Sequence, residues 1–357
     1  MKQKRNKPFR ILSITSLVAV YVLILVGGIV RSTGSGMGCP DWPQCFGQWV
    51  PPTTVAQLPE NYKEIYSQHR AEKNQKFSRY LDFLGFDQLA HQIRTDQSIL
   101  EEADFNRAKT WTEYVNRLVG VLVGFLIIAT CIASLGSLKT DRKLFSFSLL
   151  AVLMVSFQGW IGSVVVSTNL MPWMITVHML IALLIVCVLT YLVVRSGRKN
   201  LADYRISFFS KTNLVVMAAL VLTVVQIVMG TQVREAIDQV AVSLAYQERS
   251  TWIDNTGNIF IIHRTYAWMV VLVSIYLVYV LRKTVGNQHN LLFWSFMILV
   301  LVMLEVFSGA LMHYFAIPKF AQPVHLGLAT LIFGLQFLVL LKLHQNVAQR
   351  KAMLEAV

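Results

Sequence analysis

The chain has 357 residues, of which 55% are hydrophobic and 14% are charged, and its mean hydropathy is +0.53. An ordinary soluble domain carries about 25% charged residues, so this composition excludes one. Intrinsic disorder requires low hydrophobicity and high charge, and four cysteines are too few for a disulfide scaffold of this length. The class that remains is an integral membrane protein.

The formal net charge is +13, from 32 Lys and Arg against 19 Asp and Glu. In a soluble protein such an excess would suggest a nucleic-acid partner. Here the basic residues lie between apolar runs, where Lys and Arg orient a membrane protein by keeping their loops in the cytoplasm. The charge therefore favours a lipid bilayer as the partner and argues against nucleic acid.

Eight apolar stretches can each cross the bilayer as an α-helix, because about 30 Å of hydrocarbon takes about 20 helical residues. The first is followed by Arg31 and Ser32 rather than by a small-residue cleavage site, so it is expected to remain as an anchor. The sequence thus predicts an all-α polytopic membrane protein. The expected spans are residues 11–31, 114–136, 144–167, 172–194, 213–234, 260–281, 291–313 and 321–343.

Lys and Arg gather before the first span and after every even-numbered span. Short loops rich in these residues stay in the cytoplasm, so both termini are predicted to be cytoplasmic and the segment 32–112 to lie outside. Apolar residues recur at helical spacing around 80–89. Because long loops without a role are uncommon, we expect a small external cap of short helices, for which the membrane surface is one location.

A spacing of four residues recurs in the odd-numbered spans, as Gln158-x-x-x-Gly162, Gln226-x-x-x-Gly230 and Glu305-x-x-x-Gly309, with Ile24-x-x-x-Gly28 in the same place in the first. The next span begins each time with a His or a substitute: Asn116, His178, His263 and His325. Repeats of this kind indicate duplicated membrane units. We predict two four-helix halves, 11–196 and 213–343, joined by a cytoplasmic linker at 197–212 and related by a pseudo-twofold axis along the membrane normal.

The histidines of the even-numbered spans are candidate ligands, because an ionisable residue in a spanning helix is costly and marks function by default. His263 and His325 are repeat-equivalent, so a four-helix bundle can aim both imidazoles at one haem iron. In the first half the partner of His178 is Asn116, a poor iron ligand, which leaves an exchangeable site suited to a substrate haem. The alternatives are ordinary interfacial histidines, or zinc without a third ligand at the usual spacing.

Glu113 lies three residues before Asn116 and therefore on the same helix face. A carboxylate there can act as a general base or stabilise positive charge on a carbon that is being oxidised. It can equally be a first-turn Glu placed favourably at a helix N-terminus.

Four arginines near the outer ends of the spans suit haem propionates, with lipid phosphate reached by snorkelling as the alternative. Cys39 and Cys45 stand six residues apart on the outer side, where disulfides persist, and can close a small loop. The four arginines are Arg31, Arg117, Arg234 and Arg264.

Two segments resemble the haem A synthase family. One is Gly28-Ile-Val-Arg31-Ser-Thr-Gly34-Ser-Gly36-Met-Gly38-Cys39 with Trp42-Pro43 and Cys45-Phe-Gly47-Gln48, which is similar to the family's first outer loop. The other is Trp111-Thr-Glu113-Tyr-Val-Asn116-Arg117, which is similar to its Glu-x-x-His-Arg segment, and His178, His263 and His325 match its remaining histidines. The resemblance covers nearly the whole chain except the middle of the long loop. This chain departs from the family at Asn116, where a His is usual, and lacks the second outer Cys pair of some members.

The resemblance implies oxidation of the C8 methyl group of haem O to a formyl group, through a hydroxymethyl stage, which yields haem A for terminal oxidases. It implies haem b on His263 and His325, substrate haem on His178 in the first half with Asn116 and Arg117 nearby, a catalytic Glu113, and a disulfide between Cys39 and Cys45. It also implies a bacterial-type plasma membrane and a haem O synthase as partner, and leaves a homo-oligomer open.

Two other functions compete with this enzyme. One is a dihaem electron-transfer cytochrome that oxidises quinol, and the other is a haem transporter or assembly protein without catalysis. An electron carrier needs two similarly ligated haems, whereas Asn116 breaks the symmetry and Glu113 adds a reactive group beside the gap. These two residues favour the enzyme.

Overall fold

The computed structural model describes residues 7–197, 211–285 and 289–354, and within these ranges it contains helices and turns but no β-strand. Eight of its helices are long and apolar enough to cross a membrane, which confirms the predicted fold class. The helices are α1 (Lys7–Ser32), α2 (Tyr62–Phe83), α3 (Asp87–Thr95), α4 (Arg107–Ser134), α5 (Arg142–Ser167), α6 (Pro172–Ser196), α7 (Lys211–Ser243), α8 (Asn258–Val285), α9 (His289–Tyr314) and α10 (Ala321–Leu354). Short 3-10 turns lie at Val55–Gln57, Gln97–Leu100, Leu135–Ser137, Arg249–Thr251 and Asp254–Thr256.

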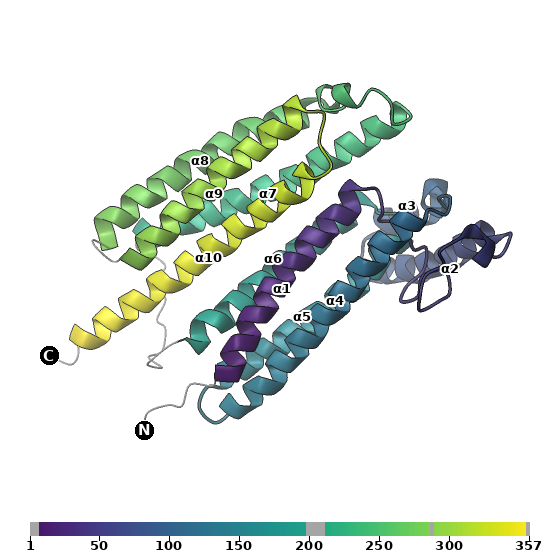
Figure 1. Cartoon of the computed structure of the whole chain (residues 1–357). Coiled ribbons are helices and arrows are strands. Elements are labelled where there is room, and N and C mark those ends of the chain that lie inside the picture. The colour runs from purple at the N-terminus through teal and green to yellow at the C-terminus, as the bar shows by residue number, and fades with distance from the viewer. Residues whose placement is uncertain (1–6, 198–210, 286–288, 355–357) are drawn as a thin grey trace.

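The long helices pack side by side in two groups (Figure 1). In one group α1 contacts α4 and α6, and α5 lies between α4 and α6; in the other, α7 contacts α8 and α10, and α9 lies between α8 and α10. The first turn of α1 and the last turn of α10 lie at the same end of the molecule (Figure 1). The twofold relation between the halves and the side of the membrane on which each end lies remain predictions.

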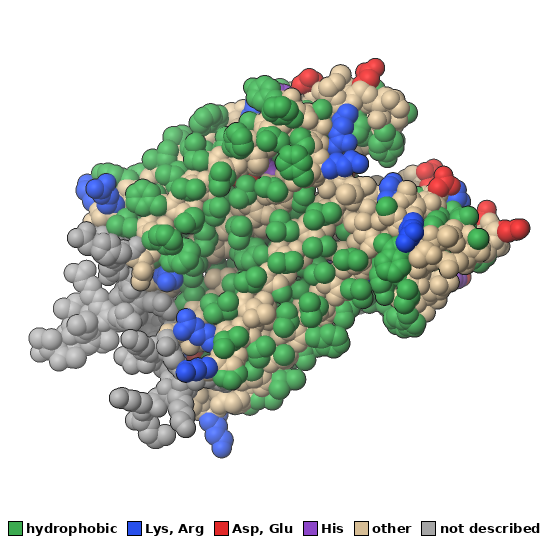
Figure 2. Space-filling model, viewed as in Figure 1, with side chains coloured by type: hydrophobic (Ala, Val, Ile, Leu, Met, Phe, Trp, Pro, Cys, Tyr) green, Lys and Arg blue, Asp and Glu red, His purple; other side chains and the backbone are tan. Residues whose placement is uncertain are grey.

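The surface agrees with a lipid environment. Apolar side chains cover the long sides of the helices, whereas Lys and Arg gather at both ends and Asp and Glu at one of them (Figure 2). A bilayer has no water to solvate charge in its core, so this division of the surface is what spanning helices require.

The two groups meet along a seam between α1 and α10. Glycines allow the close approach: a Cβ built on Gly28 would lie 3.0 Å from Pro323, and one built on Gly334 would overlap Tyr21. Small residues let membrane helices approach closely where no hydrophobic effect drives them together. The seam therefore depends on glycine.

The fifth span is longer than predicted, because α7 continues past residue 234 to Ser243. Its extra turns bury Ile237 and Ala241, four residues apart, in a cluster with Trp252. A contact made by tertiary packing thus extends the helix beyond the hydrophobic stretch that marked it in the sequence.

The predicted short helices of the long loop are present as α2 and α3, which form a cap on the C-terminal end of α5 and the N-terminal end of α6. The fully buried Arg70 on α2 organises it, donating to the carbonyl oxygens of Ile99 (2.9 Å) and Glu101 (3.1 Å) and pairing with Glu102 at 2.6 Å. Asn74 Nδ2 donates to the Ser167 carbonyl oxygen at 2.7 Å, which attaches the cap to α5.

Candidate functional site

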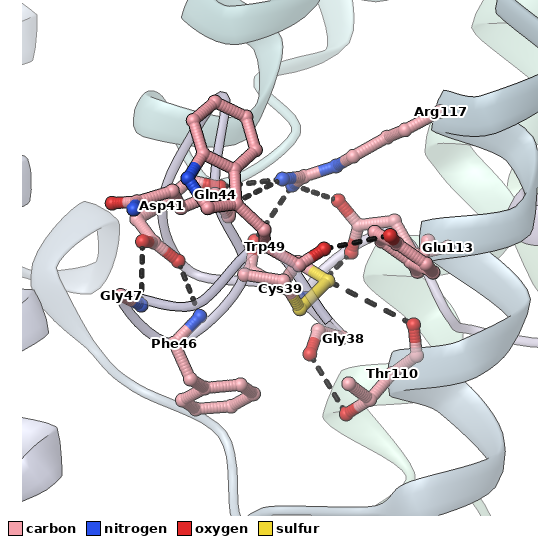
Figure 3. The surroundings of a disulfide bond; sticks show 12 residues. Gly38, Cys39, Asp41, Gln44, Phe46, Gly47, Trp49, Thr110, Glu113 and Arg117 are labelled. Carbon is pink, nitrogen blue, oxygen red and sulfur yellow. Dashed lines mark hydrogen bonds and ion pairs between the residues drawn. A yellow bond between two sulfur atoms is a disulfide. The ribbon is translucent and has the colours of Figure 1, made fainter. Parts of the chain in front are cut away.

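The loop between α1 and α2 is closed by a disulfide between Cys39 and Cys45, as predicted, and both cysteines are buried. The Asp41 carboxylate accepts hydrogen bonds from the amides of Phe46 (2.6 Å) and Gly47 (2.9 Å), as Figure 3 shows. Phe46 and Gly47 have φ of 54° and 70°, and an anchoring carboxylate stabilises this left-handed turn. The disulfide and the Asp41 carboxylate therefore both hold the loop in one conformation.

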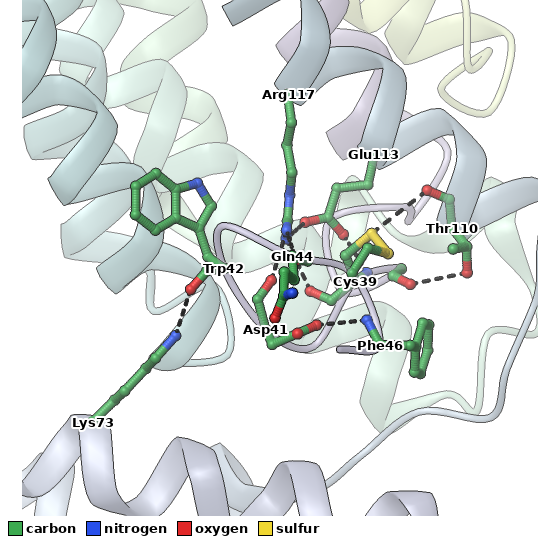
Figure 4. Close-up of polar contacts among 11 residues, drawn as sticks. Cys39, Asp41, Trp42, Gln44, Phe46, Lys73, Thr110, Glu113 and Arg117 are labelled. Carbon is green, nitrogen blue, oxygen red and sulfur yellow. Dashed lines mark hydrogen bonds and ion pairs between the residues drawn. A yellow bond between two sulfur atoms is a disulfide. The ribbon is translucent and has the colours of Figure 1, made fainter. Parts of the chain in front are cut away.

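Arg117 on α4 binds this disulfide loop through its main chain (Figure 4). Its guanidinium donates to the carbonyl oxygens of Asp41 (2.6 Å), Gln44 (2.8 Å) and Cys39 (3.0 Å). The planar fork of Arg suits several acceptors at once. Arg117, which the sequence predicts as a haem contact, thus fixes the loop in this structure.

Glu113 lies one helical turn before Arg117 and is also committed to the loop. Its Oε2 accepts from the Cys39 amide at 2.7 Å, and its Oε1 pairs with Arg117 at 2.5 Å. One turn earlier, Thr110 donates to the Gly38 carbonyl oxygen at 2.9 Å. The carboxylate is buried, and the loop that positions it was not predicted to touch it.

The repeated spacing has a common geometry in three helix pairs. A Cβ built on Gly162, Gly230 or Gly309 would lie 3.5, 3.4 or 3.3 Å from Cε1 of the facing histidine, so each glycine leaves room for an imidazole ring. The facing histidines are His178, His263 and His325 respectively.

The polar residue of each repeat lies against the same histidine. Gln158 Nε2 donates to the His178 carbonyl oxygen at 2.9 Å, and Gln226 Nε2 donates to that of His263 at 3.1 Å. Glu305 has no side-chain N–H to donate in this way, and it instead places Oε1 3.2 Å from His325 Nε2. The spacing found in the sequence therefore places one glycine and one polar side chain against each of the three histidines.

The predicted register of the first span was wrong by one residue. A Cβ on Gly27 would lie 4.0 Å from Asn116 Oδ1, whereas Gly28 faces Pro323 on α10. The rotation of α1 that builds the seam with α10 turns Gly28 away from α4, so Gly27 takes the place equivalent to Gly162.

The rings of His263 and His325 face each other with centroids 6.5 Å apart. A metal–imidazole bond is about 2 Å long, so two rings that share one metal ion have centroids about 6 Å apart. His263 Nδ1 and Glu305 Oε2 are buried without a hydrogen-bond partner, and Ser308 Oγ lies 2.8 Å from His325 Nδ1. The ring separation fits a bis-imidazole haem site, in which an iron on His325 Nε2 would replace the present contact with Glu305 Oε1.

The equivalent place in the first group holds unlike residues. His178 Nδ1 and Asn116 Oδ1 are buried and have no hydrogen-bond partner. An amide oxygen is a hard ligand and suits iron in haem poorly compared with imidazole. The two halves therefore present one pair of facing histidines and one single histidine.

Two of the four predicted arginines come together between the groups. Arg31 on α1 and Arg234 on α7 both pair with Asp238, at 3.1 and 2.7 Å, and Arg234 also binds Gln322. The Nε atoms of both arginines are buried without a partner. Arg264 lies apart from them, exposed, with its guanidinium 5.5 Å from the centre of the Phe260 ring.

The sequence profile of COX15-CtaA, described as cytochrome oxidase assembly protein, matches residues 10–337. The chain is 25% identical over 242 residues to the heme A synthase of Shewanella oneidensis, covering 67% of this chain and 61% of that protein. It is 21% identical over 352 residues to the heme A synthase of Bartonella tribocorum, covering 92% of this chain and 91% of that protein. With the heme A synthase of Alkalihalophilus pseudofirmus it shares 26% identity over 206 residues, 57% of this chain and 52% of that protein.

Proposed function

We propose, since this chain belongs to the COX15-CtaA family of cytochrome oxidase assembly proteins, that it is a haem A synthase. The reaction is oxidation of the C8 methyl group of haem O to a formyl group through a hydroxymethyl stage. The observation that carries the proposal is the facing pair His263 and His325, 6.5 Å between ring centroids, within helices that span the membrane. The names of the relatives support the same activity.

The cofactor proposed for the second half is haem b, which would supply one-electron chemistry when bound to His263 and His325. The chain prepares this site in three ways: Gly230 and Gly309 leave room for the rings, Gln226 holds the main chain of His263, and Ser308 Oγ contacts Nδ1 of His325. Fixing a ligand through its neighbours is how proteins set ring orientation.

Substrate haem is proposed to bind in the first half. His178 supplies one imidazole, and Asn116 leaves the opposite position weakly held, which suits a molecule that must enter and leave. Each oxygen of Glu113 can accept further hydrogen bonds beyond those from Cys39 and Arg117. Glu113 remains the proposed catalytic carboxylate, and the disulfide loop is what holds it in place.

Arg31 and Arg234 are the proposed propionate contacts. They share the single carboxylate of Asp238 and retain buried Nε donors without a partner, so an additional anionic acceptor would complete the cluster. Arg117 is occupied by main-chain carbonyls, and Arg264 is exposed, so these two are supported less by their surroundings.

The test is to co-express the protein with a haem O synthase, extract haems from membranes with acid and acetone, and separate them by reversed-phase chromatography. Haem A or the hydroxymethyl haem should appear, and a Glu113→Gln variant should lack both while retaining bound haem b. If haem B and unmodified haem O alone were found with haem spectrally bound, the electron-transfer cytochrome would replace this proposal. The same cells test the outer position of the disulfide loop, by labelling a cysteine introduced there with a reagent that cannot cross the membrane.

A further inference from the structure

The turn between α2 and α3 presents a compact apolar surface. Tyr80, Phe83, Leu84 and Phe86 are all exposed, Phe83 by 86%. Gly85 adopts φ of 82°, and the Phe86 amide donates to the Leu81 carbonyl oxygen at 2.8 Å, which is the hydrogen-bonded glycine ending typical of helices. The rings are therefore displayed by an ordered turn, and a contiguous exposed apolar patch marks an interaction site.

The position of this turn follows from how α2 lies on α5. Asn74 binds the Ser167 carbonyl oxygen at the outer end of α5, whereas Phe77, one turn later, has its ring 6.1 Å from that of Trp160. Trp160 precedes Ser167 by seven residues, about 10 Å along a helix. The C-terminal end of α2 thus approaches α5 at a depth within the predicted span.

The surface of α5 at that depth is itself exposed and aromatic. Phe157 and Trp160 lie with ring centroids 5.4 Å apart and are 48% and 42% exposed. Exposed aromatic residues near the end of a spanning helix are typical of the boundary between water and lipid. The apolar turn therefore continues a surface that already faces lipid.

Charges on the cap follow the same boundary. Lys76, Tyr80 and Phe83 are spaced by four and three residues on one face of α2, and Lys76 and Arg79 are exposed. Asp82, the acidic residue of α2 beside the turn, is paired with Arg94, which neutralises its carboxylate. Cations followed by tyrosine and then by phenylalanine and leucine match phosphate groups above an acyl region.

We propose that the α2–α3 turn is a membrane anchor, with Tyr80, Phe83, Leu84 and Phe86 inserted at the headgroup–acyl boundary beside α5. Lys76 and Arg79 lie at the level of the lipid phosphates. The exposed Asp87, directly after Phe86, limits the depth to this boundary. The anchor holds the far end of the cap, whose other contacts are made with the protein, and it does not depend on the proposed enzymatic function.

The experiment is spin labelling of the full chain in vesicles of phosphatidylcholine and phosphatidylglycerol. The free Cys131 and Cys187 are replaced by Ser, the disulfide is kept, and a nitroxide is attached at Leu84→Cys. Collision rates with oxygen, which prefers lipid, and with a nickel chelate, which prefers water, are measured by electron paramagnetic resonance. Phe157→Cys on α5 serves as the lipid control, and Glu60→Cys at the other end of α2 serves as the water control.

The oxygen-to-nickel ratio at position 84 should be severalfold above that at position 60 and close to that at position 157. A ratio equal to that at position 60 would show that the turn lies in water and would overturn the anchor. A label shielded from both reagents would show a protein partner or a second copy on this surface, and would overturn it equally. With Phe83→Ser and Phe86→Ser added, the ratio should fall toward the water value; an unchanged ratio would contradict the role of these rings.

Discussion

Near their N-terminal ends, α4 and α8 carry equally spaced residues that perform different tasks. Glu113, Asn116 and Arg117 on α4 correspond in spacing to Phe260, His263 and Arg264 on α8. On α4 the acid and the arginine bind the disulfide loop, whereas on α8 the phenylalanine contacts Arg264 and stacks on His313 with ring centroids 5.2 Å apart. The difference teaches that the same spacing on a helix can hold a loop, as on α4, or pack side chains against a neighbouring helix, as on α8.

The largest effect is expected from removing either of the two facing histidines, His263 on α8 or His325 on α10. His263→Ala or His325→Ala should abolish the low-spin spectrum assigned to haem b, because the facing pair then loses one imidazole. The check is the absorption spectrum of purified protein, with His313→Ala as control, since His313 stacks on Phe260 and has no facing histidine. An unchanged low-spin spectrum in the His263 variant would rule out the site in the second half.

On α4 the largest effect is expected from Glu113→Leu. It removes product, and it leaves Arg117, whose side chain is 13% exposed, without its carboxylate, which costs about 3–5 kcal/mol. Haem chromatography measures the first effect and thermal unfolding in detergent the second. Phe260→Leu, at the corresponding place, should change both far less; equal effects would mean that Glu113 has no special role.

Asn116→His would make the first half resemble the second. We expect a second low-spin haem species and slower haem A formation, because the substrate iron would gain a strong sixth ligand. Electron paramagnetic resonance of membranes that contain haem O detects the new species. If only one low-spin species were seen with the variant fully loaded, residue 116 would not face the substrate iron.

A smaller effect is expected from filling the space that one glycine leaves for its facing histidine ring. In Gly309→Ala the new Cβ lies 3.3 Å from His325 Cε1, so the ring must shift by a few tenths of an ångström, and overpacking costs about 1–3 kcal/mol. Gly120→Ala, where a Cβ meets nothing within 4 Å, should instead stabilise α4 by up to about 1 kcal/mol. Thermal unfolding and the haem b spectrum distinguish the two variants. Destabilisation of the same size in both would show that Gly309 does not make room for the His325 ring.

The smallest effect concerns another buried acid–arginine pair, Glu102 with Arg70 in the cap. Burial raises the pKa of Glu102 from 4.5 to about 7, although Arg70 opposes the shift. The folded state then holds a proton that the unfolded state releases, so this contribution to stability is complete below pH 4.5 and is lost as the pH rises to about 7. Glu102→Gln should flatten the pH dependence of cap unfolding across this window, measured by proteolysis. An unaltered slope would show that a group other than Glu102 causes the pH dependence.

Features carried by local spacing could be predicted from the sequence. The eight spans, the Cys39–Cys45 disulfide and the recurring glycine–histidine pattern all rest on hydrophobic runs or short intervals. These signals are reliable because a helix repeats every 3.6 residues and a bilayer sets the length of each span.

Features carried by long-range contacts were missed. Arg117 reaches carbonyl oxygens 73 to 78 residues earlier in the chain, and Gly28 turns toward α10 rather than α4. Each depends on the rotation of a helix about its axis, which a hydropathy pattern specifies only to within a face. Glu113 was singled out as reactive from its neighbours on α4, and its hydrogen bond from Cys39 had no local signal.

Sequence by itself determined that this chain is helical, spans a membrane and repeats a glycine–histidine spacing, because hydrophobicity and periodicity act residue by residue. Tertiary structure alone decided which glycine meets Asn116, which arginines share Asp238 and what holds Glu113. The physical reason is that these contacts join helices far apart in the chain, so their geometry exists only after the helices have packed.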